Sequence, residues 1–503
     1  MRDTRSFLTK IVFKMKIRTT FILIIVILTA NYSCKKYMNL LPPDGLVKDQ
    51  FWNTKEEVEQ VLLGAYTTFA HQDGLMFKYG EMRADMVTYL KNIPADDRKI
   101  MDGNIYPDNS LCDWYPFYKV IDYCNEVIKN APGVRNSDNT FTDFQLKGFL
   151  SEAYFLRSLS YFYLVRVFKD VPFVLEPSES DDDNYFLPKT DGDTILNHIV
   201  KDLVTYRDYA TIDGFSTPAE NKGRATKAAF DALLADISLW QFQYDDCIKY
   251  VKNIEDSKKY FLMPMDQWFE MFYPGHSLSS IFEFQYINNV ENNSMYGLTN
   301  QYGYNYGPSK TAVDFFKASA VPYESKRGEG KSIKLNSKDD YSIWKYIGLL
   351  PDGITTRPGS IQNSCGWIVY RYGDVLLMKA EALSQLNRYS EAMDILTLIR
   401  SNAGFESALD IASTPEAYED RILEERAREL AFEGKRWFDL LRMGRRNDYS
   451  RKAKLVEIIV QNVSSSQKRI LATKLTNPLG WYMPIAKGEL ERNLNLVQNP
   501  YYK

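Results

Sequence analysis

Carboxylates and guanidinium groups alternate along one stretch near the C-terminal end, RILEERARELAFEGKRWFDLLRMG (421–444). Positioned carboxylates are among the groups that general acid–base catalysis uses, so this stretch is a candidate for a catalytic site. Here Glu and Arg recur at i,i+3 and i,i+4 spacing, at which opposite charges pair on a helix. No paired carboxylate stands free of arginine, and we therefore interpret the stretch as a structural ion-pair network at a helix junction.

Residues that could bind metal ions are present but do not form recognisable ligand sets. His71, His198 and His276 lie far apart in the sequence, and no H-x-x-x-H or C-x-x-C spacing occurs, which argues against a zinc site. The acidic segment SESDDDN (178–184) offers the oxygen ligands that calcium takes, but it lacks the Gly and the distant Glu of an EF-hand. We expect a solvated loop there, with a calcium site as the alternative, and no cofactor.

The composition is that of a globular protein. Of the 503 residues, 45% are hydrophobic and 25% are charged, and the net charge is −3, so the chain can bury a sizeable core and nothing indicates a nucleic-acid partner. Aromatic residues reach 14%, many of them in Gly- and Asn-rich surroundings. Besides Cys34, the cysteines are Cys112, Cys124, Cys247 and Cys365; an exported protein could pair them, but sequence gives no connectivity.

Helical patterns predict the elements that must position these residues. One helix is expected to begin after Thr54, with Glu57 three residues later in the capping-box pattern. Further helices are expected over 115–129 and 144–168, where apolar residues recur at helical spacing. A final helix is expected to begin at Thr414, with Pro415 at its first position, and to continue through the Glu/Arg stretch.

Two helix–turn–helix segments can be superimposed on each other in sequence. Residues 225–241 with 245–254, and 373–386 with 390–402, place small residues at matching positions. These small residues are Ala235 and Cys247 in the first segment, and Ala380 and Ala392 in the second. This is the tetratricopeptide pattern, in which small residues let two helices pack closely; two generic helical hairpins are the alternative. Between them, about 261–370, helical periodicity disappears, and we expect loops with short strands.

The N-terminal residues have the sequence pattern of an export signal. Positive residues precede an apolar run, Phe21–Leu28, that is too short to span a membrane. A small residue directly precedes Cys34, as in lipoprotein signals, although Asn31 replaces the usual aliphatic residue. We expect a lipoprotein acylated at Cys34, with an ordinary signal peptide as the alternative. The segment from Met15 to Cys34 is a complete signal by itself, which favours Met15 as the true start.

Several segments together resemble the SusD/RagB family. They are CKKYMNLLPP, EEVEQVLLGAY (56–66), EAYFLRSLSYFYLVRVFKDVPFV (152–174), RYGDVLLMKAEALSQLNRYSEAMDILTLIRSNAG (371–404), RELAFEGKRWFDLLRMGR (428–445) and PLGWYMPIAKGELERNLNLVQNPYY (478–502). Any one segment is weak, but the set is specific, follows the family's order and covers essentially the whole mature chain.

The resemblance implies a fold, a location and a partner. The fold is mostly α, a split tetratricopeptide-like hairpin scaffold with long irregular loops and a few short strands. The family's proteins are outer-membrane, surface-facing lipoproteins of the Bacteroidota, anchored by acyl chains. They cap a TonB-dependent, SusC-like barrel transporter and deliver nutrient to it. Acidic residues often follow their lipidated cysteine; here Lys35 and Lys36 occupy those places.

The resemblance also implies the activity. Most members bind glycans, the RagB branch handles peptides, and none is known as an enzyme. We therefore expect a non-catalytic glycan-binding protein, with a peptide-binding protein of the same architecture as the alternative and a glycoside hydrolase as the least favoured. A hydrolase needs two carboxylates about 5–10 Å apart, and no sequence feature selects such a pair.

A glycan site would need aromatic rings on which sugar faces pack, with polar side chains that bind hydroxyls. We looked for aromatic residues in polar loops, where either ligand contact or burial in the loop core is possible, and excluded Trp437 and Tyr161, whose helical context indicates core. The candidates are Trp114, Trp268, Tyr273, Tyr302, Tyr304, Tyr306, Trp344 and Tyr346, with Arg83 and Asp85 as polar companions. The family's binding positions vary too much to carry over.

The expected organisation follows from these features. Residues 1–33 are the signal peptide and 34–50 a lipidated tether. The regions 51–260 and 261–503, the second containing the ligand-loop insertion of about 261–370, are expected to pack as one globular unit.

Overall fold

The computed structural model describes residues 51–90, 92–178, 186–299, 305–317, 326–338, 340–404, 412–463 and 465–503. The expected signal peptide, Cys34, the tether, Tyr302, Tyr304 and most of SESDDDN lie outside the described residues. Residues 54–503 form one compact unit.

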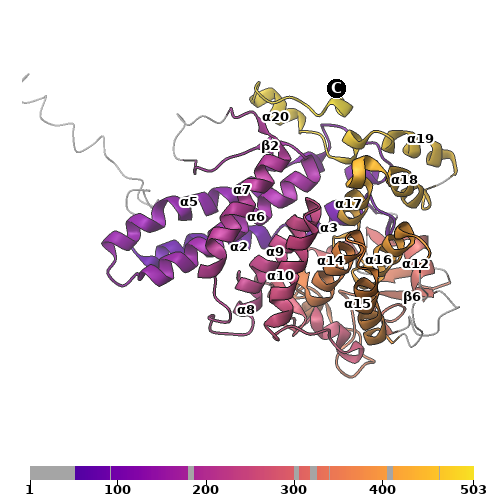
Figure 1. The fold of residues 1–503 in the computed structure, drawn as a ribbon, viewed down its shortest axis with the longest axis horizontal. Coiled ribbons are helices and arrows are strands. Elements are labelled where there is room, and N and C mark those ends of the chain that lie inside the picture. Colours follow the sequence, from indigo (N-terminus) through magenta and orange to yellow (C-terminus); the bar gives the residue numbers. More distant parts are fainter. Residues whose placement is uncertain are drawn as a thin grey trace, which may run out of the picture. The chain divides into compact units, whose positions relative to one another are not determined.

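Four helices build the N-terminal part of the unit, and each packs against the next (Figure 1). They are α2 (Lys55–Ala70), α5 (Tyr115–Ser137), α6 (Asp143–Phe168) and α7 (Gly192–Tyr206). The predicted capping box of α2 is confirmed, since Thr54 and Glu57 bind each other's backbone N–H groups, and α6 has a second box at Thr142. From Ser151 onward α6 is buried on nearly every face, which makes it the central helix of this part.

The two predicted helical hairpins are confirmed. The first is α9 (Lys227–Trp240) with α10 (Tyr244–Asp256), and the second is α14 (Tyr372–Gln385) with α15 (Tyr389–Asn402). The four small residues that defined the pattern are fully buried. Because α14 packs against α9, α10, α15 and α16 (Pro415–Glu429), hairpins far apart in sequence form one helical layer. The mostly α fold predicted from sequence is confirmed.

The segment between the hairpins contains short strands, as expected, in two-stranded antiparallel sheets. Strand β4 (Ser280–Phe284) pairs with β8 (Trp367–Arg371), and β6 (Ile333–Ser337) pairs with β7 (Asp340–Ile343). Strand β5 (Tyr306–Pro308) pairs with β1 (Val87–Tyr89), which lies far upstream. This pairing ties the insertion to the N-terminal part; β2 (Val171–Pro172) and β3 (Lys189–Thr190) form a fourth pair.

The expected single helix beginning at Thr414 is wrong, because the chain breaks it into α16 (Pro415–Glu429) and α17 (Arg436–Tyr449). At the break Phe432 and Gly434 have φ angles of 67° and 72°. Gly80 packs so closely here that an added Cβ would lie 1.9 Å from the Gly434 carbonyl oxygen. The carboxylate of Glu81 accepts from the N–H groups of Gly434 and Lys435 at 2.9 and 3.3 Å. This contact with α3 (Asp73–Glu81) fixes where α17 begins.

The remaining helices are short. They are α3 (Asp73–Glu81), α4 (Ala95–Met101), α8 (Glu220–Gly223), α11 (Met295–Thr299), α12 (Lys310–Lys317), α13 (Gly359–Gln362), α18 (Lys452–Val460), α19 (Ser465–Leu475) and α20 (Lys487–Arg492), with 3₁₀ turns between several of them. In the described ranges, no helix has the length and apolar character needed to cross a membrane.

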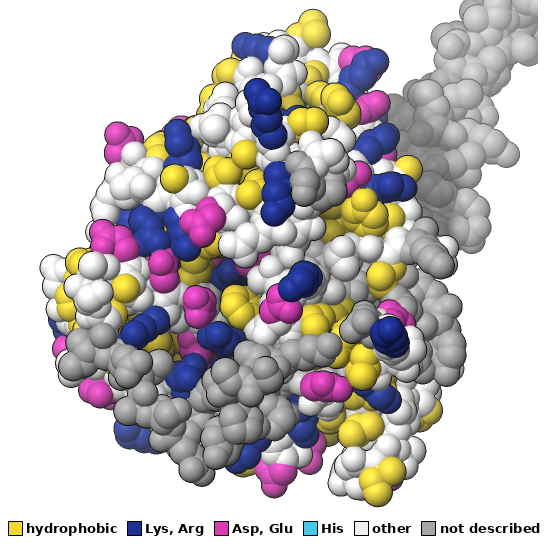
Figure 2. All heavy atoms as spheres, turned by 90° about the vertical axis from the view of Figure 1, so that its right-hand side faces the viewer, with side chains coloured by type: hydrophobic (Ala, Val, Ile, Leu, Met, Phe, Trp, Pro, Cys, Tyr) yellow, Lys and Arg dark blue, Asp and Glu magenta, His cyan; other side chains and the backbone are white. Residues whose placement is uncertain are grey.

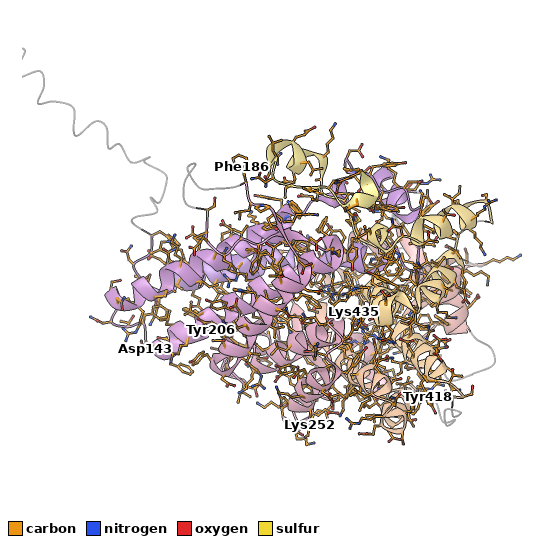
Figure 3. All side chains as sticks on the ribbon, turned by 45° about the horizontal axis from the view of Figure 1, so that its top comes forward. Asp143, Phe186, Tyr206, Lys252, Tyr418 and Lys435 are labelled. Atoms are coloured by element: carbon orange, nitrogen blue, oxygen red, sulfur yellow. The ribbon has the colours of Figure 1, made fainter. Side chains whose placement is uncertain are left out.

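Charged side chains of both signs are scattered over the face shown in Figure 2, with hydrophobic side chains between them. Figure 3 shows Lys435 among crowded interior side chains and Asp143, Phe186 and Lys252 at the periphery. The cysteines at 112, 124, 247 and 365 are buried and free, so none of the four is joined to another in this structure.

Candidate functional site

The Glu/Arg stretch forms an ion-pair network, as predicted, but the arginines that pair with Glu425, Glu429 and Glu433 include two from outside the stretch. Arg327 pairs with Glu425 and Glu429 at 2.8 and 2.9 Å, and Arg371 pairs with Glu429 and Glu433 at 2.6 and 2.8 Å. All five side chains are buried. Burial raises the pKa of Glu429, but the two arginines outweigh it and hold that pKa at about 2. A carboxylate kept ionised and enclosed in this way is suited to structure and not to proton transfer.

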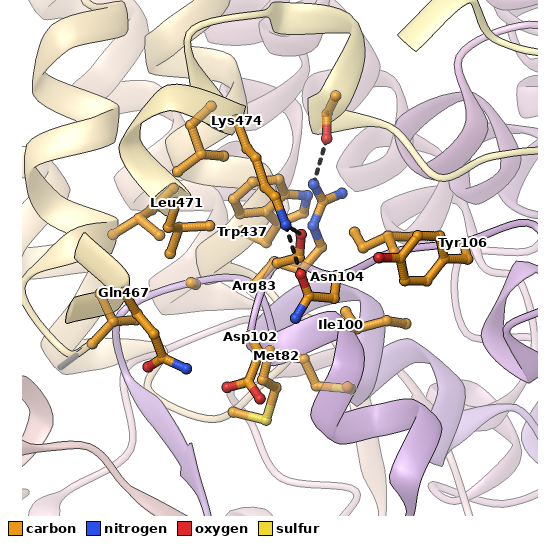
Figure 4. Close-up of a pocket in the computed structure, with 18 of the residues that line it drawn as sticks. Met82, Arg83, Ile100, Asp102, Asn104, Tyr106, Trp437, Gln467, Leu471 and Lys474 are labelled. Atoms are coloured by element: carbon orange, nitrogen blue, oxygen red, sulfur yellow. Dashed lines mark hydrogen bonds between the residues drawn. The ribbon is translucent and has the colours of Figure 1, made fainter. Parts of the chain in front are cut away.

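An open cavity of about 690 Å³, here called the α19 cavity, lies between segments from both ends of the compact unit. Its walls are the segment 82–107, which contains β1 and α4, together with Trp437 of α17, the segment 459–475 and the C-terminal residues 501–503. Figure 4 shows side chains from these segments meeting there.

Arg83, one of the residues predicted from sequence, lines this cavity. Its guanidinium carbon lies 4.4 Å from the ring centre of Trp437. Its two terminal nitrogens donate to the carbonyls of Trp481 and Gly480 at 2.6 and 2.7 Å. Burial lowers the pKa of Arg83. Trp437 is itself 2% exposed, so its prediction as a core residue is confirmed although it forms part of the cavity wall.

Helix α19 forms the opposite wall, where Gln467, Leu471 and Lys474 share one face at i,i+4 and i+7. The Lys474 ammonium donates to the Gly103 carbonyl at 2.8 Å and to Asn104 Oδ1 at 2.7 Å (Figure 4). Burial lowers the pKa of Lys474. Gly103 has a φ of 70°, and a Cβ there would lie 2.6 Å from Leu471 Cδ1, so the loop and the helix meet tightly.

Rings and polar groups complete the lining. Tyr106 is 56% exposed and offers an open ring face. The Tyr89 hydroxyl donates to Asp102 Oδ1 at 3.3 Å, and Arg98 lies 3.7 Å from the same carboxylate. Asp102 is the single carboxylate side chain among the described lining residues. An arrangement with one carboxylate, amides, cations and an exposed ring can bind a polar ligand but does not supply the carboxylate pair of a glycoside hydrolase.

The other residues predicted from sequence are mostly enclosed. Trp114, Trp268, Tyr306, Trp344 and Tyr346 are each 4% exposed or less. The Tyr346 hydroxyl donates to the Phe432 carbonyl, the Tyr306 hydroxyl donates to Asp97, and Trp344 lies under Lys334. These rings present no open face to a ligand in this structure, and they pack in the loop core, which was the alternative considered for them.

Asp85 and Tyr273 are also separate from the cavity. Asp85 is buried and forms a two-pronged ion pair with Arg436 at 2.7 and 3.0 Å. Tyr273 is partly exposed and lies beside Arg357, whose guanidinium carbon is 5.6 Å from its ring centre. Of the ten residues predicted from sequence, the eight in the described ranges are therefore not brought together, and Arg83 alone of them lines the α19 cavity.

Sequence reasoning missed Asn104, Tyr106, Gln467 and Lys474. The first two lie in MDGNIYPDN (101–109), an aromatic residue in a Gly- and Asn-containing loop, so the criterion used for the other candidates could have found them. Gln467 and Lys474 lie on an ordinary amphipathic helix and carry no such signal. In the part of the chain that the structure describes, no group of three or more His, Cys, Asp or Glu is placed to hold a metal ion.

Each half of the chain matches a known protein family. Residues 298–502 match the SusD family, and residues 36–239 match a family described as "Starch-binding associating with outer membrane". The chain is similar to SusD-like protein P38 of Formosa agariphila, with 24% identity covering 95% of this chain and 98% of that protein.

Solved structures show the same fold. A SusD superfamily protein from Bacteroides vulgatus superposes with a TM-score of 0.75 at 20% identity and covers 90% of this chain and all of that one, 100%. One from Bacteroides thetaiotaomicron superposes with a TM-score of 0.71 at 22% identity, covering 90% of this chain and 99% of the other.

Proposed function

The chain belongs to the SusD/RagB family, and from that premise we propose that it is a non-catalytic, cell-surface lipoprotein that captures glycan in the α19 cavity. The observation that carries the proposal is the make-up of the cavity. An exposed tyrosine ring, Tyr106, stands beside amide and cationic donors at Asn104, Arg83 and Lys474. A ring for a sugar face and donors for its oxygens are the two requirements of glycan binding without catalysis.

Delivery to a partner is part of the proposal. The captured glycan passes to a TonB-dependent, SusC-like barrel in the outer membrane, and acyl chains on Cys34 hold the protein there through the tether 34–50. A single acyl chain anchors only weakly, so the anchor requires more than one. The family description "associating with outer membrane" for the match over 36–239 supports this location. We retain the division into 51–260 and 261–503 within one globular unit.

The absence of catalysis is proposed from the carboxylates of the described residues. Asp102 is the one carboxylate side chain in the cavity lining, and the Glu/Arg stretch is occupied by ion pairs. We expect every glycan that binds to be recovered intact after prolonged incubation, measured by the release of reducing ends. Release of new reducing ends by the purified protein would overturn this part of the proposal.

The binding function is tested by screening residues 35–503 against plant, host and microbial glycans, with oligopeptide mixtures alongside. We expect a glycan ligand whose affinity falls about tenfold in Tyr106→Ala, because one stacking platform is lost. The matched control is Tyr115→Ala, since Tyr115 is 62% exposed and lies outside the cavity lining. Peptide binding with all glycans silent would overturn the proposal in favour of a peptide-binding protein of the RagB branch.

A further inference from the structure

Arg83 and Lys474 are cations whose hydrogen-bond partners in the α19 cavity are neutral. Arg83 donates to two backbone carbonyls, and Lys474 donates to one carbonyl and one amide oxygen. No carboxylate of the described residues lies within the 4.0 Å ion-pair distance of either group. The cavity therefore holds two positive charges without a negative partner.

Among the described residues, the buried guanidinium groups other than Arg357 are neutralised by carboxylates. Buried guanidinium groups pair with carboxylates at 2.6 to 3.1 Å, as seen for Arg327, Arg371, Arg426, Arg436 and Arg442. Arg357 differs, because it donates to the carbonyls of Leu349, Phe269 and Tyr273, but it does not line the α19 cavity. A buried cation whose hydrogen-bond partners are all neutral is thus unusual in the described residues. Two cations with only neutral partners, Arg83 and Lys474, line the same cavity.

Removing a cation from water without a counter-charge is costly. Burial lowers the pKa of both Arg83 and Lys474, and no carboxylate offsets that effect. Asp102 does not supply the missing charge, because no ion pair joins it to either cation; its carboxylate accepts from Tyr89 at 3.3 Å and lies 3.7 Å from Arg98. A negatively charged group bound in the cavity would supply the counter-charge that Arg83 and Lys474 lack.

We propose that the glycan bound in the α19 cavity carries an anionic group, a uronic-acid carboxylate or a sulfate ester, that Arg83 and Lys474 recognise. The inference rests on the proposed glycan-binding function. Both anions present several acceptor oxygens and form short, charge-assisted hydrogen bonds with such donors. The Oδ1 of Asn104 already accepts a hydrogen bond from Lys474. The group that this amide has left for a ligand is its NH₂, which is a donor. The side chains of Arg83, Lys474 and Asn104 therefore all offer donors to a ligand.

The test uses isothermal titration calorimetry of residues 35–503 with matched ligand pairs. One pair is a uronic-acid oligosaccharide and its carboxyl-reduced form; the other is a sulfated oligosaccharide and its desulfated form. We expect the acidic member of one pair to bind at least about tenfold more tightly than its neutral counterpart, with an affinity that falls as salt rises. Which pair responds identifies the anion.

Variants locate the effect. Lys474→Gln is expected to lower the affinity for the acidic ligand about tenfold and to spare the neutral one, whereas Lys474→Arg retains binding. Lys468→Gln is the matched control, because Lys468 lies on the same helix, is exposed and does not line the cavity. Asn104→Asp keeps the acceptor for Lys474 and places a carboxylate in the cavity, so it should weaken acidic-ligand binding without loss of folding by circular dichroism.

The outcomes distinguish the proposed anionic ligand from the proposed glycan-binding function. Equal binding of both members of each pair, unchanged in Lys474→Gln and Asn104→Asp, overturns the anionic ligand and leaves glycan binding intact. Binding of acidic peptides with every glycan silent overturns both.

Discussion

Arg83 joins two distant parts of the chain as well as lining the cavity. Its forked guanidinium donates to the carbonyls of both Gly480 and Trp481, and its guanidinium carbon lies over the ring of Trp437. A lysine ammonium in the same place is a point donor that cannot span two carbonyls in the plane of a fork. The contact therefore depends on the shape of the side chain and not only on its charge.

Arg83→Lys should consequently destabilise the protein by about 1–3 kcal/mol, since at least one buried carbonyl loses its donor. Chemical denaturation followed by circular dichroism measures this. Arg492→Lys is the control, because Arg492 is 78% exposed and pairs with Glu489 on the surface, where the exchange should have no measurable effect. Equal stability of wild type and Arg83→Lys would show that the two carbonyls find other donors.

Glu81 is the residue at which stability should respond most clearly to pH. It is fully buried, and its Oε1 accepts from the N–H groups of Gly434 and Lys435, whereas its Oε2 has no partner among the described residues. Burial raises the pKa of Glu81 to about 8. The folded state therefore holds a proton at pH values where the unfolded chain, near the ordinary pKa of about 4.3, has lost it.

The sign of the effect follows from proton linkage. Between the unfolded pKa and about 8, the folded state binds more protons, so the contribution of Glu81 to stability is full below the unfolded pKa and is lost as pH rises. Gln mimics the protonated acid. Relative to wild type, Glu81→Gln should gain up to about 1.4 kcal/mol per pH unit between pH 5.5 and 7.5, measured by urea denaturation at several pH values. Parallel pH profiles for the two proteins would refute this.

At the scale of elements, sequence patterns correctly predicted the features that are determined by residues close together in the chain. The glutamates of 421–444 pair with Arg327 and Arg371 from outside that stretch, whereas the capping box at Thr54 and the two hairpins depend on spacing along one or two helices. The end of α16 does not, because it is set by Gly80 and Glu81, which contact Gly434 from far upstream. The burial of loop aromatics such as Trp344 and Tyr346 also depends on what packs over them, and sequence does not show this.

The junction of α19 with the loop before it is the element contact on which the cavity depends. Gly103→Ala should destabilise the protein and weaken ligand binding together, because φ is 70° and the new methyl group would collide with Leu471. Gly148→Ala is the opposite-sign control. Gly148 lies within α6 with nothing within 4 Å of an added Cβ, so alanine should stabilise by about 0.5–1 kcal/mol. Thermal unfolding and titration of both variants measure the contrast.

At the scale of the whole molecule, the cavity belongs to neither half of the chain. Its walls come from 82–107 and from 437–503, and apart from Lys503 these segments lie in the two separate family matches, over 36–239 and 298–502. Residues predicted from one loop at a time could not reveal a site assembled from both. Arg83 holds the same two segments together, and Glu81 joins the residues directly before each of them, so ligand binding should be linked to the stability of the entire unit.

The linkage has a defined size. A ligand that binds only the folded state at about 100 times its Kd adds about 2.7 kcal/mol to the free energy of unfolding. Since residues 54–503 form one compact unit, the gain should be the same whether unfolding is followed by tryptophan fluorescence, to which Trp437 in the cavity and Trp240 in α9 both contribute, or by circular dichroism of the helices. Lys474→Gln should lose most of the gain at the same ligand concentration, and Lys468→Gln should retain it. A gain seen by one probe and not by the other would contradict the expectation that residues 54–503 unfold as one unit.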